Sequence, residues 1–147
     1  MGRIRIVISI LMFTTASSYG QALSFEQFIW ENRLVILYDD AVDTKTIQQQ
    51  LAIFQNQESE LTDRKLIIIA STPDGAYYLF KDGQLQSTAI SNTEHLNING
   101  TGFNFNLIGL DGGIKHRSQT IVSAKALFSM IDGMPMRRSE LRDRKKD

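Results

Sequence analysis

The sequence predicts a single α/β domain, in which a mixed β-sheet carries helices on both faces. Two apolar runs rich in branched residues, 33–38 and 65–71, flank a segment with helical periodicity. This is the βαβ pattern, which implies two parallel strands joined by a right-handed crossover. A turn at 111–113 between two strand-like segments predicts a hairpin, and an amphipathic segment after Ser123 predicts a closing helix.

The first 22 residues have the pattern of a signal peptide. Arg3 and Arg5 precede an apolar run, residues 6–13, that is too short to span a bilayer, and small residues follow it. Ser18, Gly20 and Ala22 are acceptable cleavage positions. No later apolar run approaches the roughly 20 residues of a membrane-spanning helix. We therefore expect an exported protein, periplasmic or secreted, without an integral membrane anchor.

Composition limits the classes of function. Without Arg3 and Arg5 the chain has 14 basic and 16 acidic residues, a net charge of −2, which argues against general nucleic-acid binding. The basic residues gather in a C-terminal tail, 137–147, which we expect to be solvated and frayed. The folded domain is expected over residues 23–136. The chain contains no cysteine, so no disulfide stabilises it and thiol redox chemistry is excluded.

The first half of the domain reads as follows. Ser24 and Gln27 fit a capping box that starts a short helix, whose apolar face comprises Phe25, Phe28 and Ile29. The continuous apolar run 33–38 predicts a strand covered on both faces. Asp43 or Thr44 can cap the next helix. The apolar face of that helix comprises Ile47, Leu51 and Phe54.

The second half begins less clearly. Residues 77–85 suggest a hairpin that turns at Asp82–Gly83, and residues 87–98 suggest a short, poor helix. Residues 103–110 alternate apolar and Asn residues, which is typical of a strand covered on one face. Residues 114–117 return antiparallel. The last helix, capped by Ser123, presents one apolar face, made of Ala124, Leu127, Phe128 and Ile131.

This order of elements is that of the thioredoxin-like architecture, and a more specific resemblance supports it. Residues 102–142, which contain "DGGIKHR" and "DGMPMRRSE", resemble the end of domain of unknown function 4174, whose members finish with a strand, "DGG.K.R", a helix and "D.MPMRR.E". The segment "FIWENRLVILY" resembles its start. The resemblance implies a peroxiredoxin-like fold with no settled activity. The same domain occurs in bacterial exported proteins and in animal secreted proteins such as the sushi-repeat-containing proteins and equarin.

The chain departs from true thioredoxins and peroxiredoxins at the position of their chemistry. Those enzymes place a cysteine just after the first strand of the βαβ unit, where this chain has the loop 39–43. Thioredoxins also place a cis-proline before the hairpin strand, where this chain has "NINGTG". Disulfide exchange and thiol peroxidase activity are therefore not expected, and no cofactor is predicted.

Three carboxylates, those of Asp39, Asp40 and Asp43, lie in this loop at the carboxyl end of a central strand, where α/β folds commonly bind ligands. They are candidate ligands of a hard cation such as Ca²⁺, which takes about 6–8 oxygen ligands. The alternative is that they cap the following helix and stabilise its N-terminus.

A second candidate site lies in the C-terminal part. By the alternation of a strand, Lys115 and Arg117 share one face, opposite Ile114 and His116. With Arg137 and Arg138, which follow Pro135 and are expected to reach outward, they would form an anion-binding patch. The alternative is that these charges protect an edge strand from aggregation.

Met134 and Met136 flank Pro135, which is expected to end the last helix. Their flexible apolar side chains suit either an adaptable contact surface or the core. Two functional hypotheses follow from the sequence. The first is a non-catalytic exported domain that binds a protein or a small anion through Lys115, Arg117, Met134, Met136, Arg137 and Arg138. The second is a cysteine-free enzyme, with a metal ion held by the acidic loop.

Overall fold

A computed structural model describes residues 22–145 of the chain. The predicted signal peptide falls almost wholly on residues 1–21, outside the described residues. Six strands form one mixed sheet in the order β5-β4-β3-β2-β7-β8, and two short strands, β1 and β6, form a separate parallel pair. The strands are β1 (Leu23–Ser24), β2 (Arg33–Tyr38), β3 (Leu66–Ser71), β4 (Tyr77–Lys81), β5 (Gln84–Thr88), β6 (Ile90–Ser91), β7 (Asn104–Ile108) and β8 (Ile114–Ser118). The helices are η1 (Phe25–Gln27), α1 (Lys45–Phe54), α2 (Glu58–Asp63), η2 (Glu94–Leu96), α3 (Ala124–Asp132) and α4 (Pro135–Asp143).

The βαβ unit is confirmed. β2 pairs in parallel with β3, from Arg33 opposite Leu66 to Tyr38 opposite Ser71, and α1 makes the crossover. All six residues of β2 are buried, because the strand lies in the middle of the sheet with both faces covered. β7 lies antiparallel on its other side, and β8 completes that edge. The fold class predicted from the sequence is therefore the observed one.

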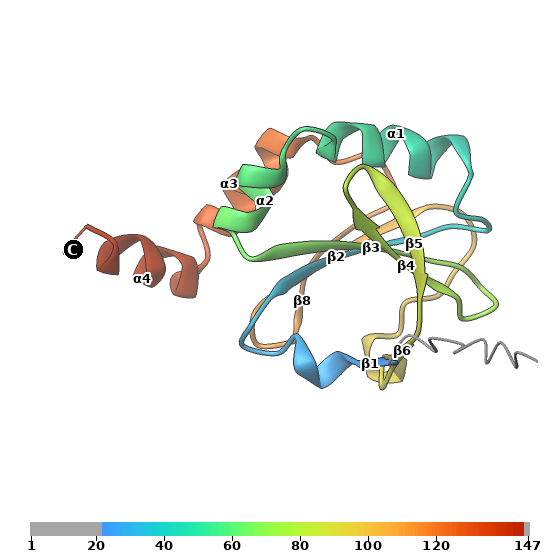
Figure 1. Cartoon of the computed structure of the whole chain (residues 1–147), viewed down its shortest axis with the longest axis horizontal. Helices are drawn as coiled ribbons and strands as arrows, with labels where there is room; N and C mark the ends of the chain where they lie inside the picture. Colours follow the sequence, from blue (N-terminus) through green and yellow to red (C-terminus); the bar gives the residue numbers. More distant parts are fainter. Residues whose placement is uncertain (1–21, 146–147) are drawn as a thin grey trace, which may run out of the picture.

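The two faces of the sheet are covered in different ways (Figure 1). α1 and α3 both pack on one face, where they bury Ile47, Leu51, Phe54, Leu127 and Ile131. The other face has no α-helix within residues 22–145. There the short 3-10 helices η1 and η2 and the β1–β6 pair cover the sheet with side chains that include Phe25, Phe28 and Leu96. Helices thus lie on both faces, but only those of one face are longer than a single turn.

The middle of the chain differs in part from the prediction. The hairpin is confirmed: β4 and β5 pair antiparallel, and Asp82 and Gly83 both have the positive φ that a two-residue hairpin turn requires. The helix predicted over residues 87–98 is wrong. β5 runs to Thr88, β6 follows, and only Glu94–Leu96 form one 3-10 turn. Ile90 pairs with Leu23 instead of starting a helix, because the sheet-like pairing covers the core better than a short polar helix would.

β7 is covered on both faces, so the prediction of a half-covered strand is also wrong. Asn106 is 3% exposed, and its side-chain amide donates a hydrogen bond of 3.2 Å to the carbonyl of Ile36 on the neighbouring strand. The buried amide is thus satisfied by backbone, which removes most of the cost of burying it. A polar residue whose side chain bonds the backbone can be buried, so its presence in a strand does not indicate that this face is exposed. The alternation of polar and apolar residues alone therefore led to the wrong prediction for β7.

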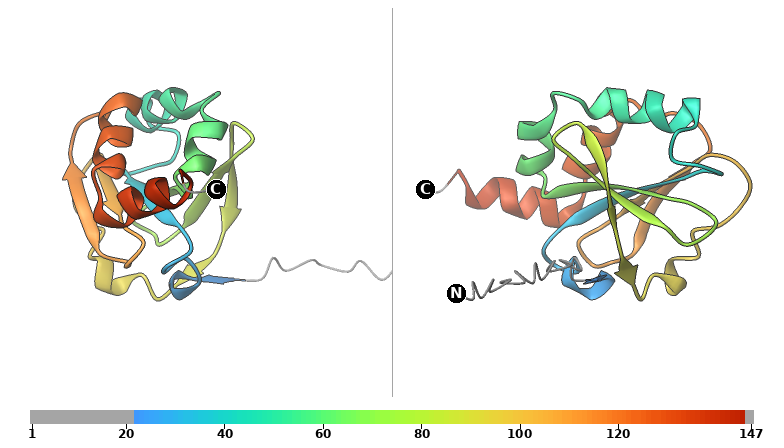
Figure 2. Two further views of the ribbon diagram at one scale, coloured as in Figure 1. Left: turned by 90° about the vertical axis from the view of Figure 1, so that its left-hand side faces the viewer. Right: turned by 45° about the vertical axis from the view of Figure 1, so that its right-hand side comes forward.

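The C-terminal segment forms a helix. Pro135 begins α4 at its first position, where its missing N–H is not needed, and α3 ends three residues earlier at Asp132. The expected frayed tail is therefore wrong for the described residues, and Arg137, expected to reach outward, is 1% exposed. Figure 2 shows α4 lying across one end of the molecule. None of the described helices is long and apolar enough to cross a membrane.

Candidate functional site at two ends of the sheet

The loop after β2 holds the three carboxylates predicted as candidate cation ligands. Asp39 is 6% exposed, and its carboxylate accepts hydrogen bonds from the backbone N–H of Asp40 at 2.9 Å and from the hydroxyl of Thr44 at 2.6 Å. Thr44 in turn caps α1 by accepting from the N–H of Ile47 at 3.3 Å. Asp39 therefore orients Thr44, which is the residue that caps α1, and does not cap the helix itself.

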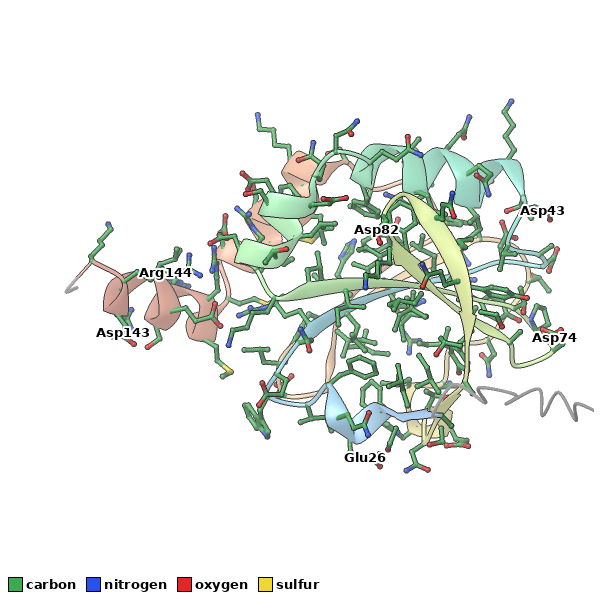
Figure 3. All side chains as sticks on the ribbon, viewed as in Figure 1. Glu26, Asp43, Asp74, Asp82, Asp143 and Arg144 are labelled. Atoms are coloured by element: carbon green, nitrogen blue, oxygen red, sulfur yellow. The ribbon has the colours of Figure 1, made fainter. Side chains whose placement is uncertain are left out.

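Asp40 and Asp43 line an open pocket of about 530 Å³ beside this loop, together with Thr72, Asp74 and Tyr78. Figure 3 shows Asp43 and Asp74 at this end of the molecule, far from Arg144 at the other end. Within residues 22–145 no group of three or more His, Cys, Asp or Glu side chains is placed to hold a metal ion. The three loop carboxylates thus do not form, with a further His, Asp or Glu, a cluster of the kind that a cation site would require among the described residues.

The opposite end of the sheet holds a network of buried charges around Arg137. The guanidinium of Arg137 contacts three carboxylates: that of Asp132 at 3.2 Å, that of Glu140 at 3.3 Å, and that of Asp63. It also donates to the carbonyl of Asp63 at 2.8 Å. Arg137 therefore joins α4 to α2 and α3 through four of its five N–H donors, and at 1% exposure it is not placed to bind a ligand in solution.

Two further arginines extend this network. Arg64, which precedes β3, bonds Asp132 at 2.7 Å and Glu60 at 2.6 Å, and its guanidinium lies 4.5 Å from the ring centre of Phe128. Arg33, the first residue of β2, bonds Glu140 at 3.1 Å. The spacing of Asp132, Arg137 and Glu140 in "DGMPMRRSE" is thus the spacing of a structural network that anchors α4.

The pKa values of this network follow from its hydrogen bonds. The hydrogen bond from Arg144 lowers the pKa of Asp63, and Arg137 lowers it further, against the opposing effect of burial. Burial raises the pKa of Asp132, but the hydrogen bonds from Arg64 and Arg137 outweigh it, so that this pKa also lies below its usual range. Both carboxylates are therefore held in the charged form.

The remaining members of the predicted anion patch do not come together. A β-bulge puts Ile114 opposite Ile108 and His116 opposite Leu107, so Lys115 is the extra residue. Consequently Arg117 turns to the face of Ile114, where it donates to the carbonyl of Leu96 at 2.9 Å, and the expected shared face of Lys115 and Arg117 is wrong. Arg138 is exposed and donates to the carbonyl of Gly133.

Lys115, Met134 and Met136 do lie together. They line a pocket of about 220 Å³ between the β7–β8 turn and the start of α4, which we call the corner pocket. Leu110 and Pro135 complete its apolar wall, and Arg33 and Asp111 contribute charged groups. Lys115 bonds Asp111 at 2.6 Å, and Met136 is 41% exposed. Half of the predicted binding residues thus converge, at the end of the sheet opposite the acidic loop.

Trp30 stands beside this pocket. Its backbone N–H donates to the carbonyl of Leu110 at 2.6 Å, while its side chain is 60% exposed. Its φ is +68°, a left-handed conformation that is unusual for a bulky residue. Most of the other described non-glycine residues with positive φ are Asn or Asp, which adopt this conformation more easily.

Sequence reasoning missed Trp30 and Arg33. Arg33 opens an otherwise apolar buried strand, and a charged residue in such a place signals a buried ion pair. Its partner, Glu140, is 107 positions away, so no local spacing reveals the pair. For Trp30 the sequence offers one indication, which is a single tryptophan in the connection between η1 and β2.

Solved structures with a similar fold include peroxiredoxins. The reduced 2-Cys peroxiredoxin of Plasmodium vivax matches with a TM-score of 0.53 at 13% identity, over 78% of this chain and 83% of that chain. Mycobacterium tuberculosis AhpC matches with a TM-score of 0.43 at 12% identity, over 69% and 68% of the two chains. Plasmodium yoelii thioredoxin peroxidase I matches with a TM-score of 0.41 at 15% identity, over 82% and 79%. The first of these supports a peroxiredoxin-like fold, and at this identity it supports the fold alone.

No curated protein sequence matches the chain. One family model does, and it covers residues 24–140, from β1 through the network that anchors α4. The two segments that resembled this family in the sequence are "FIWENRLVILY" and residues 102–142. The match includes all of the first and all of the second except residues 141 and 142. The chain therefore belongs to the family described as "Domain of unknown function (DUF4174)".

Proposed function

We propose that this cysteine-free domain is a non-catalytic binding module that recognises a partner protein through the surface formed by Trp30, Leu110 and Met136. The observation that carries the proposal is the exposure of Trp30 in a strained backbone conformation. Its N–H bonds Leu110, which lines the same pocket as the partly exposed Met136. Tryptophan and methionine are enriched in the centres of protein interfaces, and tryptophan is prominent among residues that dominate binding energy. Backbone strain of about 1–3 kcal/mol persists where function requires it.

The chemistry of this surface indicates what kind of partner fits. Its centre is apolar, and the cations Lys115 and Arg138 lie near its edge, both with exposed side chains. A partner with an apolar patch and carboxylates at the rim would be complementary. Exposed rim charges contribute mainly to the association rate and to specificity, so the apolar centre supplies most of the affinity.

The test uses Trp30→Asn. Asparagine tolerates a positive φ, so the variant should keep or slightly raise the thermal midpoint while it loses capture of partners from periplasm or medium. Ile121→Asn removes another exposed apolar side chain elsewhere and serves as the matched control, with capture retained. If Trp30→Asn melts several degrees lower, Trp30 serves the fold; if it melts normally and captures the same proteins, the surface is not the binding site.

We also propose that the domain is exported after removal of residues 1–22, on the basis of the signal-peptide pattern in the sequence. N-terminal sequencing of exported protein should find a first residue between 19 and 23. An intact Met1 on the exported protein would contradict this part of the proposal.

A further inference from the structure

The corner pocket contains a buried cation with an unused hydrogen-bond donor. Arg33 is fully buried and is one of the residues that line the pocket. Its Nη1 donates to the carbonyl of Arg64 at 2.9 Å and its Nη2 to the carboxylate of Glu140 at 3.1 Å. Its Nε, which is also buried, has no hydrogen-bond partner among the described residues. Leaving a buried donor of a charged group unsatisfied is costly, so an acceptor at this position would be stabilising.

A second cation stands at the mouth of the pocket. The aliphatic part of Lys115 passes close over Gly109, where no side chain would fit, and its ammonium bonds Asp111. The side chains of Lys115 and Asp111 are 37% and 42% exposed, so this ion pair is solvent-screened and weak. Lys115 is therefore available to exchange Asp111 for another carboxylate.

We propose that the corner pocket binds a small apolar carboxylate. The hydrocarbon part lies against Leu110, Met134 and Met136, and the carboxylate accepts from the Nε–H of Arg33, with Lys115 as a second cationic partner. Hydrogen bonds of this charge-assisted kind are roughly twice as strong as neutral ones. The methionine side chains are flexible enough to admit the ligand to the buried guanidinium. The site shares Leu110 and Met136 with the protein-binding surface, but it requires Arg33 and does not require Trp30, so variants of Trp30 distinguish the two proposals.

Two features define the ligand more closely. The volume of about 220 Å³ is below that of pockets for drug-sized molecules, about 300–1,000 Å³, so the ligand has few heavy atoms. Asp111 lines the same pocket and Glu140 bonds the same guanidinium, so a dianion such as phosphate would meet like charges on two sides. A monocarboxylate meets the same two groups with a single charge, so the repulsion is smaller. It is either a free short-chain acid or the C-terminal residue of a polypeptide with an apolar side chain.

The experiment titrates protein carrying ¹³C-methyl methionine with 4-methylpentanoate and, in parallel, with the neutral 4-methylpentanamide. The methyl resonance of Met134 should shift and saturate with the acid, and the amide should bind at least tenfold more weakly. No saturable shift with the acid, or equal binding of acid and amide, would overturn the proposal. N-acetylleucine and N-acetylglycylglycylleucine form a second pair: binding of both assigns the site to polypeptide C-termini, and binding of the free acid alone assigns it to a small metabolite-like acid.

The decisive variant is Met136→Glu, with Met136→Gln as its matched neutral control. Because Met136 is 41% exposed, both variants should fold, and Met134 remains as the reporter. The added carboxylate at the mouth should make Met136→Glu bind 4-methylpentanoate at least tenfold more weakly than Met136→Gln, which differs from it only in charge. Equal binding by both variants would overturn the proposal. Trp30→Asn should bind the acid normally, which separates this site from the protein-binding surface.

Discussion

The guanidinium of Arg137 on α4 donates a hydrogen bond to the carboxylate of Asp63 at the end of α2, 74 positions earlier in the chain. This contact belongs to a network in which Asp132 and Glu140 also bond Arg137. Arg137 is the sole residue of α4 that is classed as buried among those described. α4 is therefore held to the domain by ion pairs more than by apolar packing. The stability of its attachment should depend on pH and on the charge of Arg137 and its partners.

Arg137→Met should lower the free energy of unfolding by about 3 kcal/mol, because it leaves three carboxylates without one of their partners. We place the loss at the lower end of the range for broken buried pairs, since Asp63 and Asp132 are each 36% exposed and keep other arginines. Arg138→Met, one position later but exposed, should change stability by less than about 0.5 kcal/mol. Urea unfolding of both variants measures the difference, and equal effects would show that the network does not anchor α4.

Acid should weaken the domain through the same network. The pKa values of Asp63 and Asp132 are lower in the folded protein than their usual value of 3.8, so the unfolded chain binds protons first as the pH falls. Their contribution is complete above about pH 4 and is lost as the pH drops through the folded pKa values. Thermal midpoints measured from pH 6 to pH 2 should fall most steeply below pH 4. Arg137→Met should flatten this dependence; an unchanged profile in the variant would contradict the assignment.

Gln50 tests a second buried polar contact. It is fully buried in α1, donates to the carbonyl of Val122 at 2.9 Å and accepts from the N–H of the same residue at 2.8 Å. Gln50→Leu should destabilise the domain by about 1–3 kcal/mol, because two buried backbone groups lose their partner. Gln49→Leu, next to it and exposed, is the matched control and should change little. Hydrogen exchange of the Val122 amide should quicken in the first variant only.

Truncation of two neighbouring residues of α3, Leu127 and Phe128, should lower the free energy of unfolding by different amounts. Leu127 is fully buried, whereas Phe128 is partly exposed and lies under the guanidinium of Arg64. Leu127→Ala should cost about 3–4 kcal/mol, and Phe128→Ala, despite the larger side chain, about 2 kcal/mol. Chemical denaturation of the two variants gives the order directly. If Phe128→Ala is the more damaging, the contact with Arg64 is worth more than an exposed cation–π pair.

The sequence predicted the elements that local rules determine. The continuous apolar runs became β2 and β3, Thr44 and Ser123 became N-caps, and Asp82–Gly83 became the hairpin turn. In each case the element is determined by residues within a few positions of one another, either through their periodicity or through the conformational preference of a turn residue. The cysteine-free loop was also placed correctly, because it follows a strand that could be identified with little ambiguity.

The wrong predictions concern side chains whose burial or orientation depends on residues far away in the sequence. Arg137 looked like a solvated tail residue because its partner Asp63 lies in another helix. Asn106 looked exposed because its backbone partner lies on a neighbouring strand. Lys115 and Arg117 were put on one face because a bulge leaves no mark in alternation. Because these three placements were wrong, the predicted anion patch is not formed. Met134 and Met136 were grouped correctly, since they flank Pro135 and so lie close together in any fold.

The central claim is that this domain binds its partner at the Trp30 end of the sheet and not at the end that carries the acidic loop, residues 39–43. The most direct measurement places a photo-crosslinking amino acid at position 30 or position 136, and in separate proteins at position 41 or position 74 of the acidic end. All four positions retain at least partial exposure, so the fold should tolerate the probes. We predict crosslinked partner from positions 30 and 136 alone. Crosslinks confined to positions 41 and 74 would contradict the account.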